Sequence, residues 1–275
     1  MTTNLLDSLP KSLEFAKPEL TKTLLPSIHL ESKQTKLELW SSKFGGVPYW
    51  ESACQEEFPS DEYGNWMILL TQINFAECNG DGFLPSFPKS GILQFFISPE
   101  LETVSGSLKS EEWVDGDPNN YYLKFWNDVK KGEFLESLQS FEEIFEEIDN
   151  DENINFISPF DFSNRRKVFR EGFGITFKKF LEPINISDNS FELKILNNNK
   201  EYWNIYDTYT ESFQKKKKIG GYPFFWQIDH REKDKKRNLL LQFDPADSIG
   251  LAKFFIDQKN LLEFSFSDIF YDVEV

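Results

Sequence analysis

Short apolar runs bounded by Gly, Pro, Asn and Asp dominate the hydrophobic pattern of this chain. Runs of this length that are rich in β-branched and aromatic residues predict β-strands. The run Ile92–Ile97 is apolar except at Gln94, which favours a central strand covered on both faces. Because successive runs are not separated by long crossover helices, we expect an antiparallel sheet. The predicted strands are 69–74, 91–97, 239–244 and 250–256.

Two segments have the residue spacing of a helix. Residues 11–25 predict a helix that is interrupted near Pro18, after which the chain turns at Pro26. Between Glu133 and Asp149, apolar residues recur at helical spacing and form one stripe on an otherwise acidic segment. We therefore expect a second helix there, and the polar stretch 149–153 that follows marks a junction between two halves of the chain.

Three segments recur in the same order in both halves. Any one match could arise by chance, but colinear matches with shrinking spacers favour an ancestral duplication. The matched pairs are Lys43–Trp50 with Lys218–Phe225, Leu69–Asn74 with Leu239–Asp244, and Gly91–Ile97 with Gly250–Ile256.

The predicted fold class is α+β. We expect a largely antiparallel sheet built from two diverged repeats with pseudo-two-fold symmetry, plus a few peripheral helices. The repeats are predicted at approximately 36–150 and 160–275. Each half alone offers few strands, and paired halves bury each other's exposed face, so we expect a single domain over 1–275.

The acidic composition restricts the class of partner. The chain has 46 acidic and 30 basic residues and a formal net charge of −16. This charge repels phosphate backbones and anionic bilayers, so neither nucleic acid nor a membrane surface is an expected partner. A basic protein or a cationic ligand would be attracted. A surface that is simply well solvated explains the same charge without any partner.

The sequence predicts a cytoplasmic location. Residues 1–10 lack the basic and apolar regions of a secretory signal. The apolar runs are far shorter than the ~20 residues of a membrane-spanning helix. Cys54 and Cys78 are too few for a disulfide framework, which fits a reducing compartment.

The ordered motifs resemble those of the YwqG-like family of bacterial proteins of unknown function. The resemblance spans about Leu37 to Asp272. It rests on Leu39–Pro48, Leu69–Phe75 and Gly91–Ile97 in the first half, and on Lys218–Gln227, Leu239–Gln242 and Leu262–Phe266 in the second.

This resemblance implies a cytoplasmic, mixed α/β fold with internal duplication and no established reaction. Some relatives are associated with contact-dependent toxin systems, which implies an immunity or partner-binding role. The chain departs from the family pattern after Gln242, where the loop 244–249 is short and Ala252 and Lys253 replace a more aromatic pair.

A Lys-x-Gly-Gly-x-Pro motif occurs in each half. Consecutive glycines can present backbone N–H groups as an anion-binding nest beside a Lys ammonium. The alternative is a turn in which Gly supplies positive φ and Pro leads into a strand. On the first interpretation, ligand-binding residues converge around a pseudo-dyad: Lys43, Gly45, Gly46, Lys218, Gly220 and Gly221.

Gln72 and Gln242 occupy matching places late in the apolar strands. Their amides could bind a ligand, although a buried Gln more often satisfies the backbone of a neighbouring loop. A cleft between the halves would be lined by the Gly-Gly turns, these two Gln residues, Trp226 and Asp229.

The sequence offers no recognisable catalytic or metal-binding motif. Nucleophile, phosphate-loop, dinucleotide and zinc-protease motifs are missing, and the only histidines are His29 and His230. Three acidic strings lack the twelfth-position Glu of a calcium loop. We expect no cofactor and no metal.

The leading hypothesis is a non-catalytic binding or regulatory module, of which an immunity-type partner of a basic toxin is one form. The alternative is a small-ligand-binding protein or enzyme with a cleft between the two repeats. A third reading, a structural subunit, predicts an exposed apolar patch.

Overall fold

The structure is a computed structural model, and it describes most of the chain outside three long gaps and several short ones. The helix predicted at 133–149 and the junction at 149–153 lie outside the described residues, as do Cys54 and His230. The described ranges are 2–51, 57–61, 64, 66–98, 121–130, 172–188, 190–193, 196, 199–226, 229, 231, 237–243 and 251–274.

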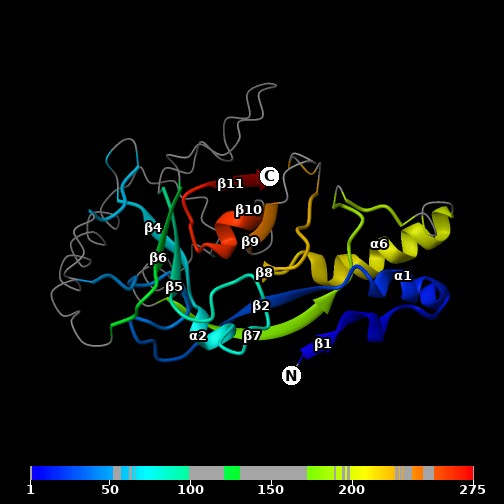
Figure 1. Ribbon diagram of the computed structural model, residues 1–275, viewed down its shortest axis with the longest axis horizontal. Helices are drawn as coiled ribbons and strands as arrows, with labels where there is room; N and C mark the ends of the chain where they lie inside the picture. The colour runs from blue at the N-terminus through cyan, green and yellow to red at the C-terminus, as the bar shows by residue number, and fades with distance from the viewer. Residues whose placement is uncertain are drawn as a thin grey trace.

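The described strands form one 11-stranded sheet. Its centre is the antiparallel pair of β2 (Leu25–Lys33) and β7 (Phe173–Glu182). Beyond β7 the order continues through β3, β4, β5 and β6, and beyond β2 through β8, β9, β10 and β11 (Figure 1). We call these groups the first wing and the second wing. Their bounds are β3 Lys43–Phe44, β4 Ile68–Asn74, β5 Ile92–Ile97, β6 Tyr121–Trp126, β8 Lys218–Gly220, β9 Arg237–Phe243, β10 Leu251–Asp257 and β11 Ile269–Glu274.

The strand pairing confirms the predicted α+β class and the largely antiparallel sheet. Neighbouring strands of the two wings pair antiparallel, and β1 (Thr2–Asn4) differs in pairing parallel with β7. The four predicted strands are β4, β5, β9 and β10. Every residue of β4 and β5 is buried, as expected for apolar strands that are covered on both faces.

The central pair β2 and β7 was not predicted, because its residues are too polar to form an apolar run. The predicted turn at Pro26 is wrong, since Pro26 is the second residue of β2. Its missing N–H does little harm there, because β8 pairs with β2 only from Ser27 to His29.

The predicted N-terminal helix exists in a shorter, mixed form. Lys11–Ala16 is the 3₁₀-helix η2, and the α-helix α1 begins at Lys17 and ends at Thr21. Pro18 occupies the first turn of α1, where a missing N–H is tolerated, so the predicted interruption is confirmed.

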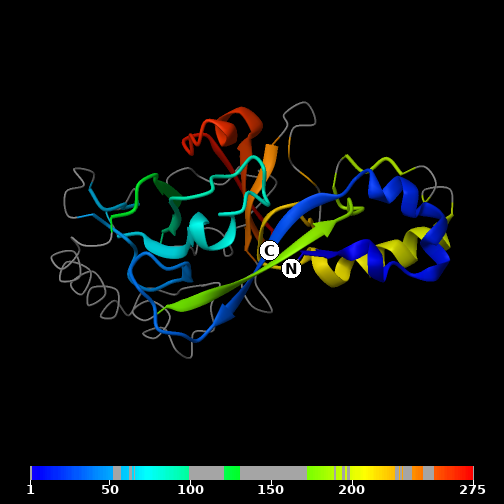
Figure 2. The ribbon, with the colours of Figure 1, turned by 60° about the horizontal axis from the view of Figure 1, so that its bottom comes forward.

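A second hydrophobic cluster forms where the N-terminal turns pack on α6 (Lys200–Gln214), at one end of the molecule (Figure 2). The sequence analysis missed α6, although Tyr202, Tyr206, Tyr209 and Phe213 follow a helical spacing of four, three and four. The Tyr209 hydroxyl donates to the Leu5 carbonyl at 2.6 Å. The remaining short helices are η1 (Leu5–Ser8), α2 (Phe75–Cys78) and α7 (Gln258–Leu262).

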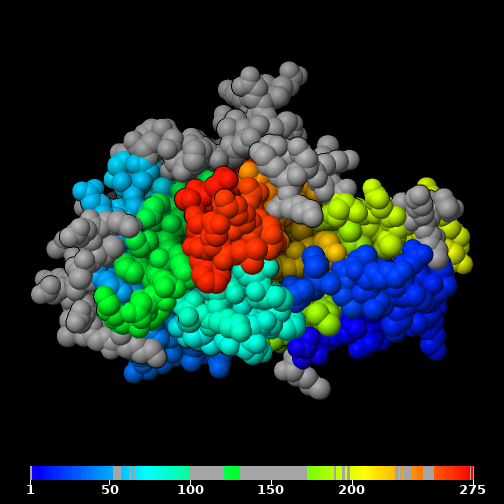
Figure 3. Space-filling view, viewed as in Figure 1, coloured from blue at the N-terminus to red at the C-terminus, as the bar shows by residue number. Residues whose placement is uncertain are grey.

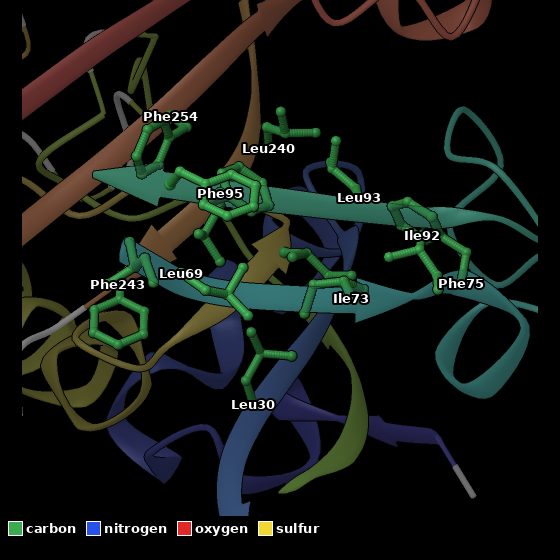
Figure 4. Close-up of a cluster of buried hydrophobic side chains, with 14 of the residues drawn as sticks. Leu30, Leu69, Ile73, Phe75, Ile92, Leu93, Phe95, Leu240, Phe243 and Phe254 are labelled. Atoms are coloured by element: carbon green, nitrogen blue, oxygen red, sulfur yellow. The ribbon is translucent and has the colours of Figure 1, made fainter. Parts of the chain in front are cut away.

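The sheet curls so that the wings share one hydrophobic core. In the space-filling view the C-terminal segment lies directly against the first wing (Figure 3). Inside, the rings of Phe95 and Phe254 lie 5.1 Å apart (Figure 4). Those of Phe44 and Phe243 lie 5.5 Å apart. The place where the wings meet is therefore filled by packed rings.

The helices that the structure describes include none that combines the length and apolar character needed to cross a membrane.

The shared core predicts a large effect of removing one of its rings. Phe254 is fully buried against the opposite wing, so Phe254→Ala should lower the free energy of unfolding by about 3–5 kcal/mol. Phe15→Ala is the matched control, because Phe15 is 44% exposed and its loss should have a much smaller effect. Urea unfolding measures both, and equal losses would contradict a core shared by the wings.

Candidate functional site

A row of polar side chains crosses the second wing. His29, Lys218, Gln242, Lys253 and Asp272 are cross-strand partners on five neighbouring strands. Residues directly opposite each other in a sheet share a face, and adjacent residues such as Ile219 and Phe254 belong to the shared core. This second-wing row therefore lies on the face away from the core. Its residues are at most 7% exposed.

The first wing has a row at the corresponding strands. Lys43, Gln72, Gln94 and Lys124 are cross-strand partners on β3 to β6. This first-wing row lies on the opposite face of the sheet from Phe44 and Phe95, where Gln94 bonds to the Tyr49 carbonyl and to Trp126 Nε1. The predicted candidates Lys43 and Gln72 therefore lie in one row, and Lys218 and Gln242 lie in the other. The two sets do not converge on one point.

Gln72 hydrogen-bonds to the backbone on both sides of the first Gly-Gly motif. Its Oε1 accepts a hydrogen bond from the Tyr49 N–H at 2.8 Å. Its Nε2 donates to the carbonyls of Leu39 and Ser41 at 2.7 and 2.8 Å. Because the amide is fully buried and fully bonded, it supports the loop backbone.

Gln242 makes the same set of contacts in the second wing. Its Oε1 accepts from the Phe224 N–H at 2.8 Å, and its Nε2 donates to the carbonyls of Gln214 and Lys216 at 2.6 and 3.0 Å. Relative to the motif lysine, these positions have the same sequence offsets as the partners of Gln72.

The glycines of both motifs adopt the turn conformation predicted for them. Gly45, Gly46, Gly220 and Gly221 have φ angles between 62° and 71°, which L side chains rarely adopt. The Gly45 N–H is bonded to the Leu70 carbonyl at 3.2 Å. The positive φ expected for a Gly-Gly turn is thus observed in both motifs.

The second Gly-Gly turn lies against a carboxylate of the chain itself, that of Glu182. The Glu182 carboxylate accepts hydrogen bonds from Lys218 Nζ at 2.9 and 3.2 Å and from the Tyr222 N–H at 2.7 Å. A Cβ at Gly221 would overlap Glu182 Oε1. The Lys-plus-backbone arrangement expected for a ligand is thus filled by Glu182.

The corresponding lysine of the first wing has a different environment. Lys43 Nζ donates to the Leu39 carbonyl at 2.9 Å. Burial lowers the pKa of Lys43 to about 7, and the nearby Glu77 offsets this only in part. For Glu182, burial alone would raise the pKa, but Lys218 and His29 together outweigh it and hold the pKa of that carboxyl below its usual range.

Lys253 is the second buried cation of the second-wing row. Its Nζ lies 2.7 Å from Asp272 Oδ2 and 2.6 Å from Glu274 Oε2, and 4.1 Å from the centre of the Phe225 ring. Glu274 Oε2 also accepts from the Trp226 N–H at 3.1 Å. Trp226 is 44% exposed, so it lies where this network reaches the surface.

Asp229 belongs to a neighbouring ion cluster. Arg231 Nη2 lies 2.6 Å from Asp229 and 2.8 Å from Asp188, and its guanidinium lies over the rings of Phe225 and Phe255. Asp229 and Trp226 therefore join Lys218 and Gln242 around the second-wing row, whereas Lys43 and Gln72 do not.

Several residues of this network were missed from the sequence. Glu182 and Glu274 lie at the ends of β7 and β11, and no local pattern distinguishes them from the other acidic residues. Lys253 did carry a signal, because a lysine within an apolar strand must be paired when it is buried.

Two buried polar atoms beside Glu182 have no hydrogen-bond partner in the described part of the chain: Ser27 Oγ and His29 Nε2. The latter lies 3.6 Å from Glu182 Oε2, which is too long for a hydrogen bond. Among the described residues, no group of three His, Cys, Asp or Glu side chains is placed to hold a metal ion.

Replacing either motif lysine by Met should change the stability of the protein differently. Lys218→Met leaves the Glu182 charge buried and unpaired, which should cost about 3–5 kcal/mol of stability. Lys43→Met removes an amine that burial disfavours, so this variant should be as stable as the unchanged chain at pH 7, or more so.

The pH dependence provides the check on Lys43. Folded Lys43 is largely neutral above about pH 7, whereas the unfolded chain stays protonated up to about pH 10.5. The unfolded state thus binds more protons, and the unchanged chain should gain stability over Lys43→Met as pH rises through this range. Urea unfolding at several pH values measures the difference, and a flat difference would contradict a neutral Lys43.

Gly221 should be far less tolerant than a glycine in open space. Gly221→Ala combines positive φ with displacement of the Glu182 carboxylate, so we expect a loss above about 3 kcal/mol. Gly64→Ala is the control, because its φ is 86° but a Cβ there would meet no atom within 4 Å. It should cost only about 1–2 kcal/mol. Similar losses in thermal unfolding would show that backbone strain alone governs both positions.

Comparison with known proteins identifies the family of the chain. No curated protein matches the sequence. The family described as Domain of unknown function (DUF1963) matches residues 42–274, a range that contains both wings and every residue of the two polar rows except His29. The chain therefore belongs to this family of uncharacterised domains.

Proposed function

We propose that the protein is a non-catalytic binding module whose partner is a basic protein. One observation carries this proposal. The two buried lysines of the second-wing row are already paired with three carboxylates of the chain, so nearly all of the formal net charge of −16 falls on the rest of the molecule. A field of that sign attracts a basic partner and speeds its association.

The state of the candidate residues supports a binding role over catalysis. Lys218 is occupied by Glu182, and the amides of Gln72 and Gln242 are occupied by loop backbone. A reaction would need such groups to be available to a substrate. A cytoplasmic immunity-type partner of a basic toxin, as implied by the YwqG-like resemblance, is one form of the proposed function.

We also propose that the two wings are diverged copies of one unit. The strand order reads the same outward from β7 and from β2. Lys43 pairs with Gln72 as Lys218 pairs with Gln242, and the two Gln residues bond to equivalent loop positions.

Small-ligand binding at the second-wing row is the second candidate. The unpartnered atoms Ser27 Oγ and His29 Nε2 favour it, because buried polar atoms normally have partners. Native mass spectrometry of the purified protein, followed by denaturation, would release a retained small molecule. A protein free of any bound molecule would count against this candidate.

The proposed function predicts a complex with a basic protein, and any basic protein encoded beside the gene is the first to test. Mixing the two should give a stoichiometric complex in size-exclusion chromatography. Its association rate should fall as salt is raised, because screening weakens steering between opposite charges. An acidic protein of similar size is the control and should elute separately. An unchanged elution profile with the basic protein would overturn the proposal.

A further inference from the structure

The turn that follows α7 places an aromatic residue where glycine is usual. The Ser265 N–H bonds to the Asn260 carbonyl at 2.9 Å, and the Phe264 N–H bonds to the Leu261 carbonyl at 3.2 Å. These two bonds define a Schellman motif, whose C′ residue has a left-handed conformation and is most often Gly. Phe264 occupies that position with φ of 54°, and no other non-glycine residue among those described has positive φ.

An aromatic residue at positive φ is strained relative to glycine. Glycine would make the same two backbone bonds without this strain, so the turn itself gives no reason for a phenylalanine. The reason must lie in what the ring contacts.

The Phe264 ring is part of an exposed apolar patch. Phe264 is 42% exposed and Leu262 is 57% exposed. The ring of half-buried Phe125 has its centroid 6.2 Å from that of Phe264 and 4.9 Å from that of half-buried Phe266, and Leu262 ends α7 two residues before Phe264. We call these four residues the α7 patch. In Figure 3 the C-terminal segment that contains α7 meets the segment of β6 on the visible face.

Covering the core explains only part of this patch. Phe125 and Phe266 pack against the shared core, so the patch is where that core reaches the surface. Leu262 and Phe264 leave about half of their surface in water, which contributes little to folding. Contiguous exposed apolar residues of this kind mark interaction sites more often than isolated ones do.

The charged residues near the patch indicate the sign of the charge that a partner would carry. Exposed Glu263 lies within the same turn, exposed Asp268 is four residues beyond Phe264, and exposed Asp128 follows β6. Lys259 is the only basic residue between 257 and 268. A second copy of this chain would bring the same acidic rim and a further charge of −16, so self-association is disfavoured.

We propose that the α7 patch is the docking surface for the basic partner, which inserts an apolar side chain flanked by Lys or Arg residues. This inference rests on the proposed function and assigns its binding surface. Apolar contact at the centre with opposite charges at the rim is the usual arrangement of a protein interface.

Phe264→Gly is the central test, because it removes the ring and relieves the backbone. We expect thermal unfolding of this variant at an unchanged or higher temperature. Binding of a fluorescent peptide that alternates Lys and Leu, followed by fluorescence anisotropy, should weaken about tenfold or more. Phe15→Ser is the matched control, since Phe15 is 44% exposed elsewhere, and it should bind as the unchanged chain does.

Two further probes separate apolar docking from general charge attraction. A peptide in which Ser replaces every Leu should bind weakly and equally to all variants, and one in which Glu replaces every Lys should not bind. Equal affinity of Phe264→Gly and the unchanged chain for the Lys–Leu peptide would overturn the docking surface.

The outcomes also separate this inference from the proposed function. If Phe264→Gly still forms the complex with the basic protein encoded beside the gene, the docking surface is wrong and the proposed function stands. If the unchanged chain binds neither that protein nor the Lys–Leu peptide, both are wrong. A dimer of the unchanged chain that Phe264→Gly abolishes would assign the patch to a second copy and overturn the basic partner.

Discussion

The buried carboxylate of Glu182 is the constraint on which the second wing depends. An ionised carboxylate cannot remain in the interior unless cations and hydrogen-bond donors surround it. Lys218 from β8 and the Tyr222 N–H from the following turn supply them, and His29 on β2 lies beside them. The approach of the carboxylate requires a residue without a side chain at 221. This one carboxylate thus fixes the positions of β7, of β8 and of the loop that joins β8 to β9.

The two wings use the same framework with different chemistry. At matching positions β5 carries Gln94, whose Oε1 accepts from Trp126 Nε1 at 2.7 Å, and β10 carries Lys253, which is paired with Glu274. The loss of a hydrogen bond such as that of Gln94 has a moderate cost, whereas breaking the buried ion pair of Lys253 leaves an unpaired charge. The second wing is therefore the half in which single substitutions should have the larger effects.

Local pattern sufficed for the strands that lie in the core, and it failed where distant residues decide the structure. β4, β5, β9 and β10 are apolar because both faces are covered, so their runs identify them. β7 mixes polar and apolar residues without a regular alternation, so no pattern identifies it as a strand. Its pairing with β2 joins segments about 150 residues apart in sequence. The Gly-Gly motif correctly predicted positive φ, and beside Lys218 the structure places the carboxylate of Glu182. That the anion is Glu182 could not be predicted, because the sequence contains 46 acidic residues and no spacing rule selects one.

The closure of the sheet explains why an apolar surface remains beside α7. Along β6, Tyr121 and Phe125 point to the core side. Tyr121 is held to β11 of the second wing by its hydroxyl bond to the Ile269 carbonyl at 2.8 Å and by the ring of Tyr271. At the other end of β6, the α7 turn covers Phe125. Phe266 would be enough to cover Phe125, because its ring lies nearer to that of Phe125 than the ring of Phe264 does. Phe264 adds a half-exposed ring at the expense of backbone strain, and a strained residue that stabilises little in the folded chain is most simply explained by a contact made outside it.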